Sequence, residues 1–337
     1  MLLRGVAAPR RRGPVASRPR RGIVGPVKTR LAVLLVLVAA VAGLLFVAAR
    51  RLEPAAGPGV SITQSVPVGQ ASLTLGVIGD FGYANANEKS VASLVAGWAP
   101  DAVVATGDDY YSQAGGSGTA RYDRSVGADY CAFLHGAAPG PACQSGGAAD
   151  QNRFWSVPGN HDYTDAGIGS YTGYFPYPGN ERFFSVRIGT VEVFLLDSDV
   201  ALRDSGEMAA QRAWLEGAAR ASTARWKIAV FHQPPYSSGS KHGSATDMRW
   251  PFASWGIQLV LNGHEHLYER VAAEGITYVT DGLGGAPRYV FGAPITGSAA
   301  RFADDFGALR LVVTDAAIDG AFVSVDGVTR DAFTITR

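Results

Sequence analysis

Five short apolar segments, each followed by a polar side chain, constrain the fold of this chain more than any other feature. The segments are residues 73–78, 101–106, 154–158, 227–231 and 257–261. Each has the length of a buried strand, and each leads directly into a turn that contains glycine or a polar residue. In open α/β sheets, ligands bind beyond the carboxyl ends of the strands. We therefore expect the five segments to belong to one domain and to present their polar residues to one site.

The remaining segments predict a mixed α/β fold. Helices are expected at 87–98 and at 206–219, where apolar residues recur at helical spacing. Strands at 183–188 and 191–196 are separated by Gly189 and Thr190 and predict a hairpin. Further strands are expected near residues 277–280, 309–313, 321–325 and 331–336. Early βαβ units followed by late antiparallel strands predict a four-layer α/β/β/α sandwich, with two mixed β-sheets flanked by helices.

The amino-terminal part differs in charge from the rest of the chain. Residues 1–52 hold eleven Lys or Arg and no acid, which leaves 19 basic and 29 acidic residues in 53–337. Residues 31–49, between Arg30 and Arg50, form an unbroken apolar run whose helical length approaches the thickness of a bilayer core. We expect 31–49 to be a single transmembrane signal-anchor helix, and the basic residues before it keep that end cytoplasmic.

This reading divides the chain into four parts. Residues 1–30 are the expected cytoplasmic tail, 31–49 the N-terminal transmembrane helix, 50–70 a linker, and 71–337 an extracytoplasmic domain. A cleaved signal peptide, which would make the domain secreted, is the alternative, but the basic region is long and Arg50 and Arg51 directly follow the apolar run. The tail is suited to anionic lipid head groups. Nucleic acid is not an expected partner, because the tail has no aromatic residues for stacking.

The chain has two cysteines, Cys131 and Cys143. In an extracytoplasmic domain a disulfide between them is expected, and closing so short a loop contributes about 3 kcal/mol. Two separately buried thiols are the alternative.

The polar residues at the strand ends are all oxygen or imidazole donors. They are Asp80, Asp108, Tyr111, Asn160, His161, His232, His264 and His266. This mixture suits iron, zinc or manganese, because a site for a soft metal would need thiolates. A pair of ions about 3.5 to 4 Å apart needs one bridging carboxylate and open positions for water and substrate. The donor set therefore predicts a dinuclear metal centre.

The order of these motifs resembles that of the calcineurin-like metallophosphoesterases over residues 72–290. The motifs are Gly79-Asp80-Phe81-Gly82, Gly107-Asp108-Asp109-Tyr110-Tyr111, Gly159-Asn160-His161-Asp162, His232 and Gly263-His264-Glu265-His266. Gly82 stands where most of that superfamily has a histidine. The purple acid phosphatase branch, which includes the tartrate-resistant type, shows the same exchange, and Tyr111 stands where that branch has its tyrosine.

The resemblance implies a ligand set for each ion. Asp80, Asp108, Tyr111 and His266 would hold Fe(III), because a phenolate oxygen prefers a hard trivalent ion. Asp108, Asn160, His232 and His264 would hold a divalent ion (Fe, Zn or Mn), so that Asp108 bridges the two. His161 and His242 would touch the substrate phosphate or protonate the leaving oxygen. A merely structural imidazole is the alternative for His161, and an exposed loop histidine without a role is the alternative for His242. Asp162 is expected to orient a neighbouring residue, with a turn-forming role as the alternative.

The activity that the resemblance implies is the hydrolysis of phosphate monoesters by attack of a metal-bound hydroxide, with a histidine as general acid. A phosphodiesterase or nucleotide hydrolase of the same superfamily is the second possibility, since the metal core does not select the ester type. A cell-surface binding protein with a vestigial metal site is the non-enzymatic possibility. Its expected sign is a missing ligand, and the motifs above lack none.

Overall fold

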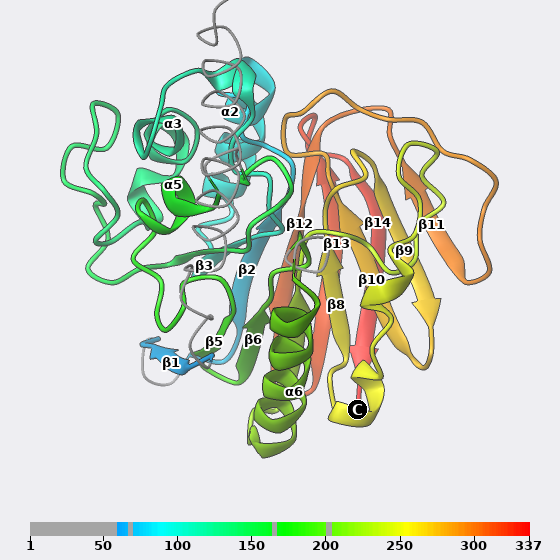
Figure 1. Ribbon diagram of the computed structural model, residues 1–337. Coiled ribbons are helices and arrows are strands. Elements are labelled where there is room, and N and C mark those ends of the chain that lie inside the picture. The colour runs from blue at the N-terminus through cyan, green and yellow to red at the C-terminus, as the bar shows by residue number, and fades with distance from the viewer. Residues whose placement is uncertain (1–58, 67–69, 164–166, 200–203) are drawn as a thin grey trace, which may run out of the picture. The chain divides into compact units, whose positions relative to one another are not determined.

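Two mixed β-sheets make up the core of the structure (Figure 1), a computed structural model that describes residues 59–66, 70–163, 167–199 and 204–337. The described residues belong to one compact unit, 55–337. The predicted cytoplasmic tail, 1–30, and transmembrane helix, 31–49, lie outside the described residues. Among the residues that are described, no helix is long and apolar enough to cross a membrane.

The larger sheet has eight strands, with a parallel centre and antiparallel pairs toward its edges. β6, β7, β8 and β10 run parallel to one another, whereas β5 pairs antiparallel with β6 as the predicted hairpin, and β9 pairs antiparallel with β10. In spatial order the sheet contains β1 (Ser61–Gln64), β5 (Phe184–Ile188), β6 (Val191–Leu195), β7 (Trp226–Val230), β8 (Leu259–Asn262), β10 (Ile276–Asp281), β9 (Tyr268–Ala273) and β11 (Ser298–Phe302).

The smaller sheet has six strands and joins the early part of the domain to its carboxyl terminus. β2, β3 and β4 are parallel, and β12 pairs antiparallel with β2 from the other side. In spatial order the sheet contains β14 (Thr329–Thr336), β13 (Ala317–Ser324), β12 (Gly307–Val313), β2 (Leu73–Ile78), β3 (Ala102–Ala105) and β4 (Phe154–Ser156).

Alternation along the strands produces two apolar layers. In β6, Val193 and Leu195 belong to the large hydrophobic core that also contains residues of β2, β3 and β12 from the other sheet. The intervening Phe194 packs instead with Leu215 of α6 (Ser205–Ala221), on the outer face of the larger sheet. Because successive strand residues point to opposite faces, the larger sheet is buried on both sides.

Helices lie outside the sheets, as the sequence predicts (Figure 1). α2 (Ala86–Gly97) packs near β12, and its first turn is capped by the Asn85 side chain, which accepts the N–H groups of Asn87 and Glu88 at 2.9 Å. α6 begins at the cap residue Asp204 in the same way. These Asx caps satisfy backbone donors that the helices leave unpaired.

The long connection between β3 and β4 forms a helical insertion. It contains α3 (Ala120–Tyr122), a π turn over Asp123–Gly127 and α4 (Ala128–Tyr130), while α5 (Gly169–Thr172) follows β4. Cys131 and Cys143 form a disulfide in this insertion, so that prediction is confirmed and the alternative of two free thiols is wrong.

Three strands differ from the sequence-based expectation. Ser61–Gln64, placed in the linker 50–70, forms β1 and pairs parallel with β5, so the ordered fold begins before residue 71. β9 and β11 were not predicted as strands, although they pair antiparallel with each other. β1 and β11 pair with strands that are distant in the sequence, which a local pattern of residues does not report, whereas β9 forms a hairpin with β10 through Glu274 and Gly275.

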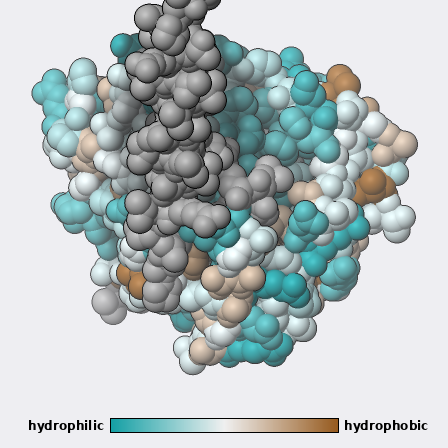
Figure 2. Space-filling view, in the orientation of Figure 1, coloured by the Kyte–Doolittle hydropathy of each residue, from teal (hydrophilic) through white to brown (hydrophobic). Residues whose placement is uncertain are grey.

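The surface shows few large apolar side chains. Among the described residues, the exposed large hydrophobics are Val60, Val290 and Val328. Figure 2 shows a face on which hydrophilic and weakly polar residues predominate and strongly hydrophobic ones are scattered. Single exposed apolar residues are normal for a globular surface.

Candidate metal centre

The predicted ligands come together where strands of both sheets end. Asp80 follows β2 and Asp108 follows β3 of the smaller sheet, whereas His232 follows β7 and His264 follows β8 of the larger one. Asp80, Asp108 and His264 have positive φ angles of 53°, 56° and 71°. Such conformations are uncommon for residues other than glycine and are found where surrounding structure imposes them, often at functional sites.

A first group of donor atoms surrounds the Tyr111 hydroxyl. Its Oη lies 3.2 Å from Asp80 Oδ1, 2.9 Å from Asp108 Oδ2 and 3.0 Å from His266 Nε2. Asp80 Oδ1 is also 3.4 Å from His266 Nε2. All four side chains are buried. These are the four residues that the family resemblance assigns to one ion.

A second group surrounds the Nε2 atom of His232. This nitrogen lies 3.2 Å from Asn160 Oδ1, 3.2 Å from His264 Nδ1 and 3.4 Å from Asp108 Oδ2. The same oxygen of Asp108 therefore belongs to both groups, which is the position that a bridging carboxylate occupies. Asp80, Asp108 and His232 also form a compact set of potential metal-binding atoms, all within 4.8 Å of one another.

The Nδ1 hydrogen bonds of His232 and His266 orient both rings so that each Nε2 could bind a cation. His232 Nδ1 donates to the Thr106 carbonyl at 2.9 Å, and His266 Nδ1 donates to the Pro287 carbonyl at 2.7 Å. Each ring therefore turns an Nε2 lone pair toward the carboxylates, as metal-binding histidines do. Donors bound at about 2.0 to 2.2 Å from one ion lie roughly 3 Å apart. The observed spacings match this requirement.

Charges within the cluster oppose each other. Burial disfavours protonated His232, but Asp108 outweighs it and raises the pKa of His232 well above its usual value. Burial and the neighbouring His232 lower the pKa of His264 to about 2. Burial, with Asp108 and Asp80, raises the pKa of Tyr111. A cation would relieve these conflicts, since it attracts both the carboxylates and the neutral imidazoles.

Gly82 is required by close backbone packing. A Cβ at this position would lie 2.1 Å from the carbonyl carbon of Asp109 and 2.3 Å from the nitrogen of Tyr110. The carbonyl of Gly82 accepts the N–H of Tyr111 at 2.8 Å, which ties the first motif to the second. This packing holds the turn at Gly82 against the backbone that leads to Tyr111.

The two histidines predicted to contact substrate are exposed beside the donor groups. The ring of His161 lies 4.4 Å from that of Tyr111, and its backbone N–H donates to Asp108 Oδ1 at 2.9 Å. The ring of His242 lies 4.1 Å from that of His264. Although the ring is exposed to solvent, partial desolvation on the side that faces the site, with the charges of His266 and Lys241, lowers the pKa of His242. One exposed imidazole thus accompanies each donor group.

Buried residues behind the ligands hold the loops in place. Asp162 Oδ2 accepts the N–H of Gly159 at 2.8 Å and that of Asp109 at 3.3 Å, so it orients the turn that carries Asn160, as predicted. Asp109 itself accepts a hydrogen bond from Ser156 at 2.5 Å. Its carboxylate faces this buried serine and is not among the donor atoms described above.

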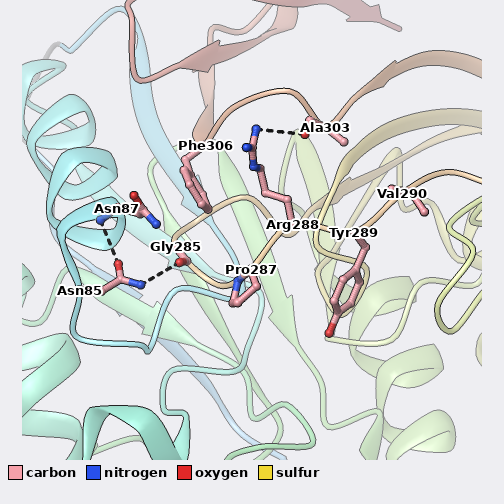
Figure 3. Close-up of a pocket in the computed structure, with 9 residues that line it drawn as sticks. All are labelled: Asn85, Asn87, Gly285, Pro287, Arg288, Tyr289, Val290, Ala303 and Phe306. Carbon is pink, nitrogen blue, oxygen red and sulfur yellow. Dashed lines mark hydrogen bonds between the residues drawn. The ribbon is translucent and has the colours of Figure 1, made fainter.

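One residue of the site was missed by the sequence analysis. Tyr289 stacks on the ligand His266, with ring centroids 3.9 Å apart and planes at 10°, and its N–H donates to the carbonyl of that histidine. Tyr289 and Pro287 also line a pocket of about 520 Å³ together with Asn85, Arg288 and Phe306 (Figure 3). Tyr289 carries no motif, and its role arises only from the folding of the 285–292 loop onto the site.

A buried carboxylate near the site predicts an unusual dependence of stability on pH. Burial raises the pKa of Asp199 to about 7, whereas an unfolded aspartate has a pKa near 4. Between these values the folded state keeps a proton that the unfolded state has lost. The free energy of unfolding therefore falls as pH rises, by up to about 1.4 kcal/mol per pH unit. Asp199→Asn should remove this part of the slope in urea titrations of the metal-free protein at pH 5, 6 and 7.

The exposed Asp304 offers a matched control for this experiment. Asp304→Asn should leave the slope of the parent protein unchanged. Equal slopes for the parent and for Asp199→Asn would contradict the assignment of a buried, protonated carboxyl at position 199.

Comparisons with known proteins agree with this geometry. A family model described as calcineurin-like phosphoesterase matches residues 73–268. Purple acid phosphatase 15 of Arabidopsis thaliana is 28% identical over 132 residues, which cover 34% of this chain and only 24% of that protein. Purple acid phosphatase PPD1 from yellow lupin (Lupinus luteus) seeds shares the fold, with a TM-score of 0.63 and 19% identity over 81% of this chain and 55% of that one.

The same fold occurs in GAP50, described as the anchor in the inner membrane complex of Plasmodium, with a TM-score of 0.60, 16% identity, and coverage of 79% of this chain and 89% of that one. At these identities the solved structures establish the fold, and function has to be argued from the site. The family model spans more than half of the chain, and every residue of the two donor groups lies within the part that it matches. The chain belongs to the calcineurin-like phosphoesterase family, and its resemblance to the purple acid phosphatase branch is confirmed.

Proposed function

We propose that the chain is a dinuclear-metal phosphatase that hydrolyses phosphate monoesters, similar to purple acid phosphatases. The observation that carries this proposal is the sharing of one Asp108 oxygen by two groups of donor atoms, each with an exposed histidine beside it. Two bound cations would supply an activated water and neutralise charge on the phosphoryl group. The water oxygen forms a bond to phosphorus, the ester P–O bond breaks, and the products are phosphate and an alcohol.

The chain's own residues would position the substrate and deliver one proton. His161 is held by its backbone N–H on Asp108 and presents its ring to solvent next to Tyr111. An imidazole at this place is suited to donate a proton to the leaving oxygen as a general acid. His242, beside His264, is suited to contact the phosphate or to share this role.

His161→Ala should separate the proton donor from the metal ligands. We expect the rate on an alkyl phosphate to fall by roughly 10² to 10⁴-fold, the usual contribution of a general acid. The loss should be much smaller on an aryl phosphate with a good leaving group, and metal content should stay unchanged. Steady-state kinetics on both esters and metal analysis test this expectation. An unchanged rate on the alkyl phosphate would remove His161 from the mechanism.

His135 provides a matched control, since it is an exposed histidine whose Nδ1 is paired with the carbonyl of Ala149 at 2.8 Å, away from the donor groups. His135→Ala should retain the parent rate on both esters. A parallel assay with a phosphodiester tests the competing assignment, because a faster diester reaction would favour a phosphodiesterase or nucleotide hydrolase.

The first donor group supports Fe(III) with a divalent Fe, Zn or Mn partner. Tyr111 would bind as a phenolate, and a phenolate on Fe(III) gives a strong charge-transfer band in the visible range. Tyr111→Phe should abolish that band while the divalent ion remains bound through the second group. A visible spectrum and metal analysis of the oxidised protein are the measurements. An active, iron-loaded and oxidised parent protein without the band would overturn the purple acid phosphatase assignment.

A non-enzymatic role is the second candidate, because the fold also occurs in a protein described as an anchor. The donor groups favour catalysis, since each predicted ligand lies in one of them and two exposed histidines accompany them. A surface binding protein has no physical need for this arrangement. Metal-loaded protein without activity on any phosphate ester would favour the non-enzymatic role.

The location of the domain is a proposal from the sequence. The apolar run 31–49 and the basic residues before it support a single-pass membrane protein with its catalytic domain outside the cytoplasm. Membrane fractionation with alkaline extraction tests the anchor, and release of the protein into the medium would indicate cleavage and secretion.

A further inference from the structure

A buried glutamate between two predicted ligands contacts the loop that carries His242. Glu265 has no exposed surface, and its Oε1 accepts the N–H groups of His242 and Gly243 at 2.6 Å each. Glu265 is not among the donor atoms of the two groups that contain His264 and His266, and its carboxylate accepts hydrogen bonds from this loop instead. Its carboxylate is thus directed at residues 237–243, which we call the His242 loop.

The His242 loop approaches this carboxylate closely because of Gly239. A Cβ at this position would lie 2.2 Å from the carboxyl carbon of Glu265 and 2.4 Å from its Oε2. No side chain other than hydrogen leaves room for the carboxylate between Gly239 and the two N–H groups. Hydrogen bonds from N–H groups to a carboxylate are short and about twice as strong as neutral ones. The loop therefore closes around a charged acceptor.

Other contacts fix the remaining parts of the same loop. Glu269, four residues after Glu265, accepts the N–H of Ser238 at 2.7 Å and its hydroxyl at 2.6 Å. Gly292 donates its N–H to the Ser238 carbonyl at 2.7 Å, which joins the loop to the segment that carries Tyr289. These bonds hold the beginning of the loop. The two bonds to Glu265 are the ones that act at His242 itself.

The imidazole of His242 depends on this backbone for its place. Its ring lies 4.1 Å from the ring of His264 and 5.8 Å from that of Tyr289, and it is exposed to solvent. An exposed loop histidine without a fixed backbone would sample many orientations. The hydrogen bonds from the N–H groups of His242 and Gly243 to Glu265 fix the backbone at His242 and so restrict the positions that its ring can reach.

We propose that Glu265 is a positioning residue that holds His242 beside the second donor group for substrate contact. This inference rests on the proposed phosphatase function for its consequences in catalysis, but the contact itself can be tested without activity. Glu265 acts through the His242 backbone and does not touch substrate. Glu265 thus supports a third histidine from a position between two predicted ligands.

The test combines amide exchange with a double-mutant cycle on the full chain. Glu265→Val should accelerate hydrogen exchange of the His242 and Gly243 amides by at least about tenfold, since they lose their acceptor. Glu265→Gln should protect them, because its amide oxygen can still accept both bonds. Glu274→Gln is the matched control, as this exposed glutamate contacts the Tyr236 hydroxyl and not the loop backbone. Unchanged exchange in Glu265→Val would overturn the proposal.

Kinetics on an alkyl phosphate then report whether the position of His242 matters. Glu265→Val and His242→Ala should lower the rate by similar factors, and the double variant should fall no more than about threefold further, because both changes remove one interaction. Fully additive losses would contradict a shared role. If the parent protein hydrolyses no phosphate ester, the proposed function fails while the exchange experiment still decides the contact.

A second variant addresses the same contact from the loop side. Gly239→Ala places a methyl group against the Glu265 carboxylate and should accelerate exchange in the loop even if Glu265→Val does not fold. Gly217→Ala, where nothing lies within 4 Å of the added carbon, is its control and should leave exchange unchanged. Equal exchange in Gly239→Ala and the parent would also count against the proposal.

Discussion

Asp108→Asn is expected to remove most of the bound metal and to lower kcat/KM by roughly 10⁴-fold, about 5.5 kcal/mol of transition-state stabilisation. Asp108 Oδ2 lies 2.9 Å from the Tyr111 hydroxyl and 3.4 Å from His232 Nε2, so it is adjacent to both donor groups. An asparagine keeps the size of the side chain but loses the negative charge that two cations would share. Both sites are therefore affected by a single change. Metal analysis of the purified protein and steady-state kinetics on a phosphate monoester are the measurements.

Asp204→Asn is a suitable control for this experiment. Asp204 caps α6, and asparagine caps a helix about as well as aspartate. This variant should keep its metal and its activity. Full metal occupancy in Asp108→Asn would show that Asp108 does not bridge two ions.

Gly82→His should fail to add a ligand and should instead disrupt the site, with a loss of at least about 3 kcal/mol in stability. Any Cβ at position 82 would lie 2.1 to 2.3 Å from backbone atoms of Asp109 and Tyr110. Flexible side chains can move away from such a contact, but a backbone that is hydrogen-bonded on both sides cannot do so cheaply. Displacing it also moves Tyr111, whose N–H donates to the Gly82 carbonyl. We expect loss of iron binding together with lower thermal stability.

Gly82→Ala tests whether the added Cβ alone, without an imidazole ring, causes the loss of stability and iron binding. It should show most of the same loss, because the Cβ is the atom that collides. Gly217→Ala provides the matched glycine control, since its added carbon meets nothing within 4 Å and alanine is favoured over glycine within a helix by about 1 kcal/mol. A stable, metal-loaded Gly82→His protein would show that the loop can rearrange to accept a side chain at position 82.

The two donor groups explain why one domain uses strands from both sheets. Asp80 and Asp108 come from the smaller sheet, and His232 and His264 from the larger one. Relative movement of the sheets would pull the groups apart. The continuous apolar core between the sheets opposes such movement, because separating it would expose large buried side chains to water.

The sequence by itself determined the ligand types, their order and most of the elements that carry them. The strands before Asp80, Asp108 and His264 were predicted because short apolar runs and the turns that end them are local signals. The helices corresponding to α2 and α6 were predicted within a few residues for the same reason. Which residues share a metal was implied by the family pattern, and the distances among them agree with that assignment.

Only the tertiary structure decided the parts that depend on contacts between distant segments. β1 pairs with β5 and β11 pairs with β9, and each pair joins segments that are far apart in the sequence, so no local periodicity predicts them. The stacking of Tyr289 on His266 and the support of His242 by Glu265 likewise join loops that carry no shared motif. Local sequence sets which groups stand at the end of a strand, whereas their distances arise from how two sheets and their loops pack, which is a property of the whole domain.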